Sequence, residues 1–233
     1  MTTVETVDEG AVHGFLHRPA SVSFASPVAT LALTHGAGSN CDTVLLRAVA
    51  DGFAAAGAQV LRFDLAFRVR RASGPPHPSR AAEDRAGIAE VIAALRKDYS
   101  VPGPVLLGGH SYGGRQASML AAENPGLVDG LVLLSYPLHP PKKPEKLRTE
   151  HLPDLNTPTV VVHGSKDEFA TTEEMRAALA LIPAATRLVE FEGARHDLSV
   201  VKFPGGGGDS RGRIGGVCVL NAERAVARVG GSW

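Results

Sequence analysis

Short, nearly continuous runs of apolar residues recur along the middle of the chain, and a stretch of helical character follows most of them. The runs predict buried strands at 28–34, 59–63, 105–108, 131–134, 159–162 and 187–191. Strands buried on both faces read as continuous apolar runs, and their alternation with helices is typical of a parallel sheet covered on both faces. We therefore predict an α/β fold with helices at about 42–56, 81–97, 115–123 and 172–181.

Both ends of the chain depart from this alternation. Residues 2–7 and 11–18 are β-prone and flank a polar turn, which predicts an antiparallel hairpin at one edge of the mostly parallel sheet. Beyond residue 203 the sequence is rich in glycine, a composition typical of a flexible linker. We predict one domain over residues 1–203 and a separate segment over 204–233, in which 217–229 fit a short helix or a strand equally well.

The composition excludes several classes of partner. The 24 basic and 24 acidic residues give a formal net charge of zero, and only 5% of the 233 residues are aromatic. Such a chain offers neither a positive field nor a stacking platform for nucleic acid. No apolar run reaches the ~18 residues of a membrane span, and the first residues lack a signal-peptide pattern. We expect a soluble, cytoplasmic protein without nucleic-acid or membrane partners.

The two cysteines, Cys41 and Cys218, lie far apart in the sequence. Neither belongs to a Cys-x-x-Cys pair or lies near a set of candidate metal ligands, so we predict no metal site. Two reduced thiols are the simplest interpretation for a cytoplasmic protein of this size, and a single disulfide is the alternative.

A Gly-x-Ser-x-Gly sequence at 109–113 lies directly after an apolar run and directly before a predicted helix. In a nucleophile elbow, a sharp strand-to-helix turn strains the serine backbone, and the flanking glycines leave room for that turn. This context favours an elbow over a plain glycine-rich turn. We predict that Ser111 is a nucleophile and that His110 lines the substrate site.

A second glycine-rich turn, His35-Gly36-Ala37-Gly38, follows the first strand after the hairpin. In the elbow pattern, one N–H of this turn and the N–H after the nucleophile bind the oxyanion. We expect Ala37 and Tyr112 to supply these groups, with a purely structural turn as the alternative. His35 precedes the serine, out of order for the base, so we expect a structural role or a place lining the site.

A serine nucleophile needs a base, and the base needs an acid that orients it. The expected chain order is serine, acid, histidine. Asp167 lies in a turn after a buried strand, and the adjacent Glu168 is its main competitor. Of nine histidines, His196 is the one that follows the last predicted strand. We predict that Asp167 and His196 complete the site. The alternative for Asp167 is an ordinary turn residue, and the alternative for His196 is an exposed histidine in a loop.

Residues 28–198 resemble the α/β-hydrolase superfamily, and more narrowly a small branch close to the dienelactone hydrolases. Three segments carry this resemblance: Leu33-Thr34-His35-Gly36-Ala37-Gly38, Gly109-His110-Ser111-Tyr112-Gly113-Gly114-Arg115 and His163-Gly164-Ser165-Lys166-Asp167. The branch includes bacterial hydrolases of undefined substrate and a eukaryotic subunit of a chromatin-modifying complex. The resemblance implies an α/β-hydrolase fold without a large cap domain, hydrolase chemistry and no cofactor. Ser111 stands where dienelactone hydrolases proper usually carry cysteine, and glycine-rich sequence stands where the superfamily usually places a closing helix.

These features together predict a carboxylesterase-like serine hydrolase that cleaves a small-molecule ester or thioester by double displacement. The connection at 135–157 is too short for a cap domain, so we expect an open site. Arg68 and other arginines of the loop at 68–80 could favour an acidic substrate, and a solvated basic loop is the alternative. A non-catalytic scaffold with the same fold, or acyl transfer to an acceptor other than water, are the competing functions.

Overall fold

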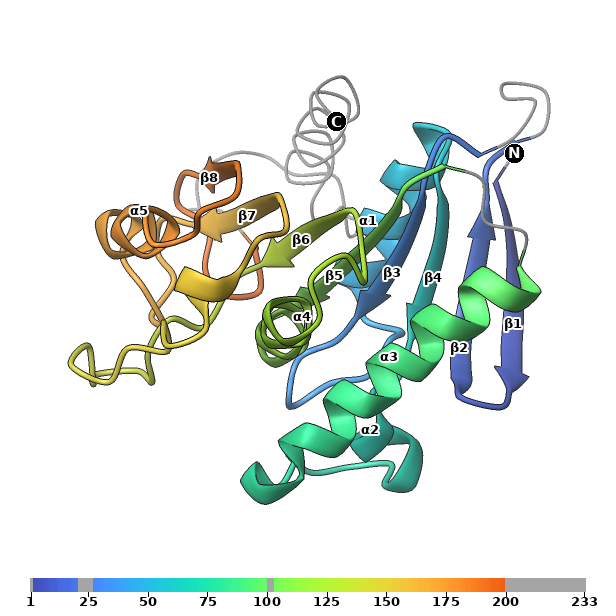
Figure 1. The fold of residues 1–233 in the computed structure, drawn as a ribbon, viewed down its shortest axis with the longest axis horizontal. Helices are drawn as coiled ribbons and strands as arrows, with labels where there is room; N and C mark the ends of the chain where they lie inside the picture. The colour runs from blue at the N-terminus through green and yellow to red at the C-terminus, as the bar shows by residue number, and fades with distance from the viewer. Residues whose placement is uncertain (1, 21–26, 100–102, 200–233) are drawn as a thin grey trace, which may run out of the picture.

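The computed structural model describes residues 2–20, 27–99 and 103–199. Within them, one sheet of eight strands has the order β1-β2-β4-β3-β5-β6-β7-β8 (Figure 1). The strands are β1 (Thr3–Glu9), β2 (Val12–Arg18), β3 (Thr30–Thr34), β4 (Gln59–Phe63), β5 (Val105–His110), β6 (Gly130–Leu134), β7 (Thr159–Gly164) and β8 (Thr186–Phe191). Strands β3 to β8 run parallel to one another, and the β1–β2 hairpin joins β4 antiparallel. This confirms the predicted mostly parallel sheet with an N-terminal hairpin.

Helices cover both faces of this sheet, as predicted (Figure 1). They are α1 (Val44–Ala55), α2 (Ala66–Arg70), α3 (Ala81–Asp98), α4 (Tyr112–Glu123) and α5 (Thr172–Leu179), with 3-10 turns η1 (Pro78–Arg80) and η2 (Leu152–Asp154). Helix α1 packs on one face against Leu31 and Leu33, whereas α3, α4 and α5 cover the other face, where Ala32 lies. Alternate residues of β3 therefore serve two cores, because successive side chains of a strand point to opposite faces.

The central strands are apolar throughout because neither face meets water. All residues of β3, β4, β6 and β7 are buried. The edge strand β1 is almost wholly exposed, and its sequence is correspondingly polar. Local hydrophobic patterning thus carries enough information to place the strands within a few residues.

Three predicted boundaries were wrong in ways that affect the site. Helix α1 begins at Val44 and not near residue 42, because its cap is Thr43, whose hydroxyl accepts from the Leu46 N–H at 3.3 Å. Helix α2 lies at the start of the stretch predicted as an arginine-rich loop. Helix α4 begins at Tyr112 and not near Arg115, so Ser111 lies directly at its N-terminus. The prediction missed this first turn because it contains glycines at 113 and 114, and glycine has low helix propensity.

The connection between β6 and β7 contains only the turn η2 as regular structure, in agreement with the predicted absence of a large cap domain. Its His151 donates from Nε2 to the Ser118 hydroxyl of α4 at 2.8 Å, and that hydroxyl donates to the Arg115 carbonyl. No helix of the described residues is long and apolar enough to cross a membrane. The predicted segment 204–233, with its uncertain element at 217–229, lies outside the described residues.

The burial of His151 predicts that the free energy of unfolding decreases in acid. Burial, with Arg115 nearby, lowers the pKa of His151 to about 4, whereas the unfolded chain titrates near 6.5. Between these values the unfolded chain binds more protons, so the stabilisation present above pH 6.5 is lost as the pH falls toward 4. We expect His151→Gln, which keeps an N–H donor, to reduce the loss of unfolding free energy between pH 7 and pH 5 by about 1–2 kcal/mol, allowing for solvent screening. Urea titrations of both proteins at the two pH values measure this, and equal losses would contradict it.

Candidate active site

Ser111 lies in a sharp turn between β5 and α4. Its backbone angles, φ 51° and ψ −116°, fall in a region that a side-chain-bearing residue rarely adopts. A Cβ at Gly109 would lie 2.5 Å from the Gly114 nitrogen, and one at Gly113 would lie 2.4 Å from the His35 carbonyl oxygen. The flanking glycines are therefore required by close backbone contacts. The hydroxyl of Ser111 is held at the helix N-terminus, where negative charge is favoured.

Two further side chains continue from this serine in one hydrogen-bonded chain. His196 Nε2 lies 2.8 Å from Ser111 Oγ, and His196 Nδ1 lies 2.9 Å from both carboxylate oxygens of Asp167. The Asp167 side chain is fully buried, whereas that of His196 is 21% exposed. An Nδ1–H bound by the carboxylate leaves Nε2 free to accept the serine proton. Glu168, the competing acid, is exposed.

The His196 loop rests on the end of β7. Gly164 permits this contact, because a Cβ there would lie 2.5 Å from the Ala194 carbonyl oxygen and 2.6 Å from that of Arg195. The Phe169 ring packs on the imidazole of His196 with centroids 4.1 Å apart. Sequence reasoning missed Phe169, although an aromatic residue two positions after the predicted acid was an available signal.

His110 holds the same loop from the other side. Its Nε2–H donates to the His196 carbonyl at 2.9 Å, and its ring lies against Gly36 and the His196 ring. Burial lowers the pKa of His110, which keeps the ring neutral. The structure thus places His110 as a support of the His196 loop, whereas the sequence analysis expected a residue lining the substrate.

Ala37 and Tyr112 are each adjacent in sequence to a residue of this arrangement: Tyr112 follows Ser111, and Ala37 follows Gly36, where a Cβ would lie 3.5 Å from the Ser111 Cβ. Tyr112 is the first residue of α4, and the first N–H groups of a helix have no partner within it. Among the described residues, neither the Ala37 N–H nor the Tyr112 N–H donates a hydrogen bond. Two uncommitted donors beside a strained serine are a suitable arrangement for a developing oxyanion.

Residues 27–210 match the model of the alpha/beta hydrolase domain family. The chain belongs to this family. The dienelactone hydrolase of Anabaena variabilis has a TM-score of 0.69 at 21% identity, over 100% of this chain and 96% of that one. An alpha-beta serine hydrolase homologue from Coxiella burnetii has a TM-score of 0.62 at 18% identity, over 84% and 88%. An esterase domain from Rhodothermus marinus has a TM-score of 0.64 at 16% identity, over 99% and 97%.

At these identities the structural neighbours establish the fold, and the family match assigns the chain to the hydrolases. Both agree with the resemblance inferred from the three sequence segments.

Two residues predicted to line the substrate site of this hydrolase do not do so. His35 is fully buried: its Nδ1–H donates to the Gly36 carbonyl at 2.8 Å, and its Nε2 accepts from the Leu65 N–H at 3.1 Å. Burial lowers its pKa, so it stays neutral. Both ring nitrogens of His35 therefore form internal hydrogen bonds. This agrees with a structural role, one of the two roles expected from the sequence.

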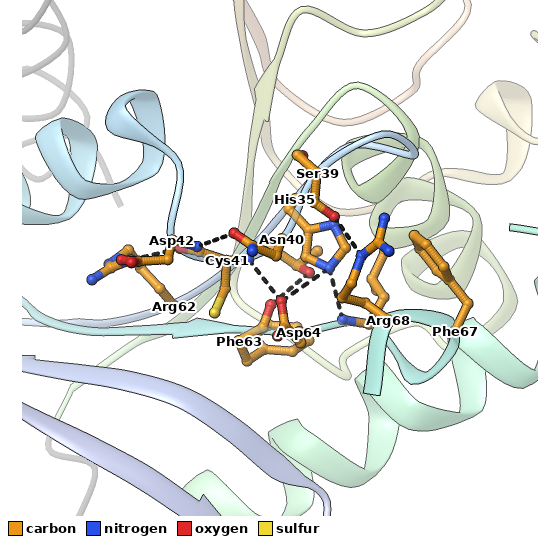
Figure 2. A network of polar contacts seen from close by, with 12 residues as sticks. His35, Ser39, Asn40, Cys41, Asp42, Arg62, Phe63, Asp64, Phe67 and Arg68 are labelled. Atoms are coloured by element: carbon orange, nitrogen blue, oxygen red, sulfur yellow. Dashed lines mark hydrogen bonds and ion pairs between the residues drawn. The ribbon is translucent and has the colours of Figure 1, made fainter. Parts of the chain in front are cut away.

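Arg68 is also buried, and its guanidinium donates hydrogen bonds to main-chain carbonyl groups. It donates to the Ser39 carbonyl at 2.8 Å (Figure 2). It also donates to the carbonyl groups of Arg71 at 3.1 Å and Gly74 at 3.2 Å. The interpretation of Arg68 as a contact for an acidic substrate was therefore wrong. Sequence alone could not distinguish the two roles, because both require the same fork of donors.

The rest of the turn after β3 is tied to β4 (Figure 2). Asp64 accepts from the Cys41 N–H at 2.7 Å, and Arg62 donates to the Cys41 carbonyl and to Asp42. Burial raises the pKa of the Cys41 thiol to about 12, which keeps it protonated and unreactive. The described residues include no group of three or more His, Cys, Asp or Glu side chains that could hold a metal ion. Cys218 lies outside the described residues.

Proposed function

We propose that this hydrolase cleaves a carboxylic ester or thioester, with Ser111 as nucleophile, His196 as base and Asp167 as the acid that orients it. The observation that carries the proposal is the continuous hydrogen-bonded chain from Ser111 Oγ through His196 to the buried carboxylate of Asp167. Each group has the partner that its role requires, and the backbone strain at Ser111 is of the kind found at catalytic turns.

In the first half-reaction, Ser111 Oγ attacks the carbonyl carbon and passes its proton to His196 Nε2. The carbonyl oxygen becomes an oxyanion and accepts from the N–H groups of Ala37 and Tyr112. The tetrahedral intermediate then collapses: the bond to the leaving alcohol or thiol breaks, and His196 returns the proton to it. Asp167 stabilises the imidazolium while the proton resides there.

In the second half-reaction, water attacks the acyl-serine and gives its proton to His196. The second oxyanion occupies the same pair of N–H groups, and collapse releases the acid and restores the Ser111 hydroxyl. Alcohols and thiols leave more easily than amines, which favours esters and thioesters over amides. Two of the structural neighbours, an esterase domain and a dienelactone hydrolase, are in keeping with this choice.

A fluorophosphonate probe tests the proposal, since it reacts covalently with activated serines. We expect the probe to label the wild-type protein and not to label Ser111→Ala. For His196→Ala we expect a labelling rate about 10³-fold below that of the wild type. Ser79→Ala removes an exposed serine of η1 and is the matched control, which we expect to label at the wild-type rate. A folded wild-type protein that resists the probe would contradict the proposal and favour the non-catalytic scaffold.

A further inference from the structure

Helix α2 lies between the two turns that carry the proposed oxyanion donors. The Phe67 ring of α2 packs edge-on against His35, at a centroid distance of 5.5 Å, and against Tyr112, at 6.0 Å. His35 belongs to the turn that contains Ala37, and Tyr112 is the first residue of α4. One short element thus contacts both halves of the proposed oxyanion hole.

Asp84 of α3 anchors one side of this arrangement. Its carboxylate is fully buried, and one oxygen accepts from the Phe67 N–H at 2.9 Å while the other accepts from the Tyr112 hydroxyl at 2.7 Å. Burial raises the pKa of Tyr112, so the phenol stays protonated and donates. Among the described residues, no cation forms an ion pair with Asp84. Burying a carboxylate on neutral donors is costly, and here its two hydrogen bonds join α2 and α4.

The other side of α2 is tied to the turn that carries Ala37. The Leu65 N–H, just before the helix, donates to His35, and Arg68 donates from Nε to the Ser39 carbonyl at 2.8 Å (Figure 2). The Ser39 N–H in turn donates to the Gly36 carbonyl at 3.3 Å. The position of the Ala37 N–H is therefore coupled to α2 at both ends of its turn.

We propose that Asp84 is a positioning residue that, through α2 and the Tyr112 hydroxyl, sets the separation of the Ala37 and Tyr112 N–H groups. This inference rests on the proposed function, in which these two groups bind the oxyanion. The Tyr112 hydroxyl fixes the side chain of the residue whose N–H must point at the substrate, and α2 fixes the opposing turn. Misplacing a reacting or stabilising group by about 1 Å costs roughly 100-fold in rate.

The test compares Asp84→Ala with Asp84→Asn on a p-nitrophenyl ester. We expect Asp84→Ala to lower kcat about 10–100-fold with little change in KM, because the contacts serve the transition state and not the bound ester. An asparagine can accept from the Phe67 N–H and donate to the Tyr112 oxygen, so we expect Asp84→Asn to keep kcat within a few-fold. Asp129→Ala is the matched control, since Asp129 accepts from the Val105 N–H at the amino end of β5, whereas Ser111 follows its carboxyl end.

Inhibitor binding separates positioning from a merely structural role. A trifluoromethyl ketone forms a tetrahedral oxyanion on an active serine, whereas the corresponding methyl ketone does not to a comparable extent. We expect Asp84→Ala to weaken the binding of the trifluoromethyl ketone by the same factor by which it lowers kcat. The binding of the methyl ketone should not change. Tyr112→Phe removes only the hydroxyl and tests the same tether even if Asp84→Ala does not fold. In the double variant, the Tyr112→Phe loss should not multiply the Asp84→Ala loss, because both substitutions remove the bond between Asp84 and the Tyr112 hydroxyl.

A different pattern would overturn the inference. If Asp84→Ala and Tyr112→Phe both keep the wild-type kcat, and Asp84→Ala only lowers the melting temperature as Asp129→Ala does, Asp84 is structural. Fluorophosphonate labelling of the wild-type protein distinguishes this result from failure of the proposed function. A labelled, active wild type with unaffected variants overturns the role of Asp84 alone, whereas an unlabelled wild type overturns both.

Discussion

We expect Asp167→Asn to lower kcat by about 10⁴-fold while leaving the protein folded. The Asp167 side chain is fully buried, and both of its oxygens lie 2.9 Å from His196 Nδ1. An asparagine of the same shape can present its own N–H to the imidazole, which favours the tautomer that cannot accept the Ser111 proton. It also removes the charge that stabilises the imidazolium. Steady-state kinetics on a p-nitrophenyl ester, with circular dichroism to verify the fold, measure the effect.

Glu168→Gln is the matched control for this substitution. Glu168 is exposed and adjacent in sequence, and it was the other candidate acid. We expect its replacement to change kcat less than about twofold, as is usual for surface substitutions. A large loss in Glu168→Gln together with an active Asp167→Asn would reverse the assignment of the acid.

Gly164→Ala should damage stability and catalysis together. A Cβ at this position would lie 2.5 Å from the Ala194 carbonyl oxygen and 2.6 Å from the Arg195 carbonyl oxygen. Both belong to the main chain that leads into His196, so the clash is relieved only by moving the loop that carries the proposed base. We expect a loss of about 2–3 kcal/mol in unfolding free energy and of about 100-fold in kcat.

Gly103→Ala provides a control for the stability part of that prediction. Gly103 has a positive φ of 78°, and a Cβ there would lie 2.7 Å from the Val28 carbonyl oxygen, near the start of β5 and away from Ser111. We expect a comparable loss of stability by urea titration with an unchanged kcat for the folded protein. If Gly164→Ala also keeps the wild-type kcat at a temperature where it is folded, the His196 loop does not depend on this contact.

Much of the fold follows from local patterns. The continuous apolar runs predicted the central strands, because the environment of a buried strand is apolar on both sides and is written into each segment separately. The sharp turn at Ser111 was also predictable, since Gly109 is required there by a contact only five residues away, with Gly114, although Gly113 is required by the distant His35 carbonyl. The helix boundaries were less accurate where a cap or an internal glycine decided them, as at Thr43 and Tyr112.

The sequence by itself determined the class of fold, the position of the strained serine and a short set of candidates for its partners, because these depend on spacing along the chain. Only the tertiary structure decided what each candidate contacts. It directs His35 and Arg68 into internal hydrogen bonds, brings His196 to Ser111, and joins Asp84 to Tyr112 through the packing of α3 on α4. Residue type specifies which donors and acceptors a side chain has, whereas the packing of elements far apart in the sequence determines which partners they reach.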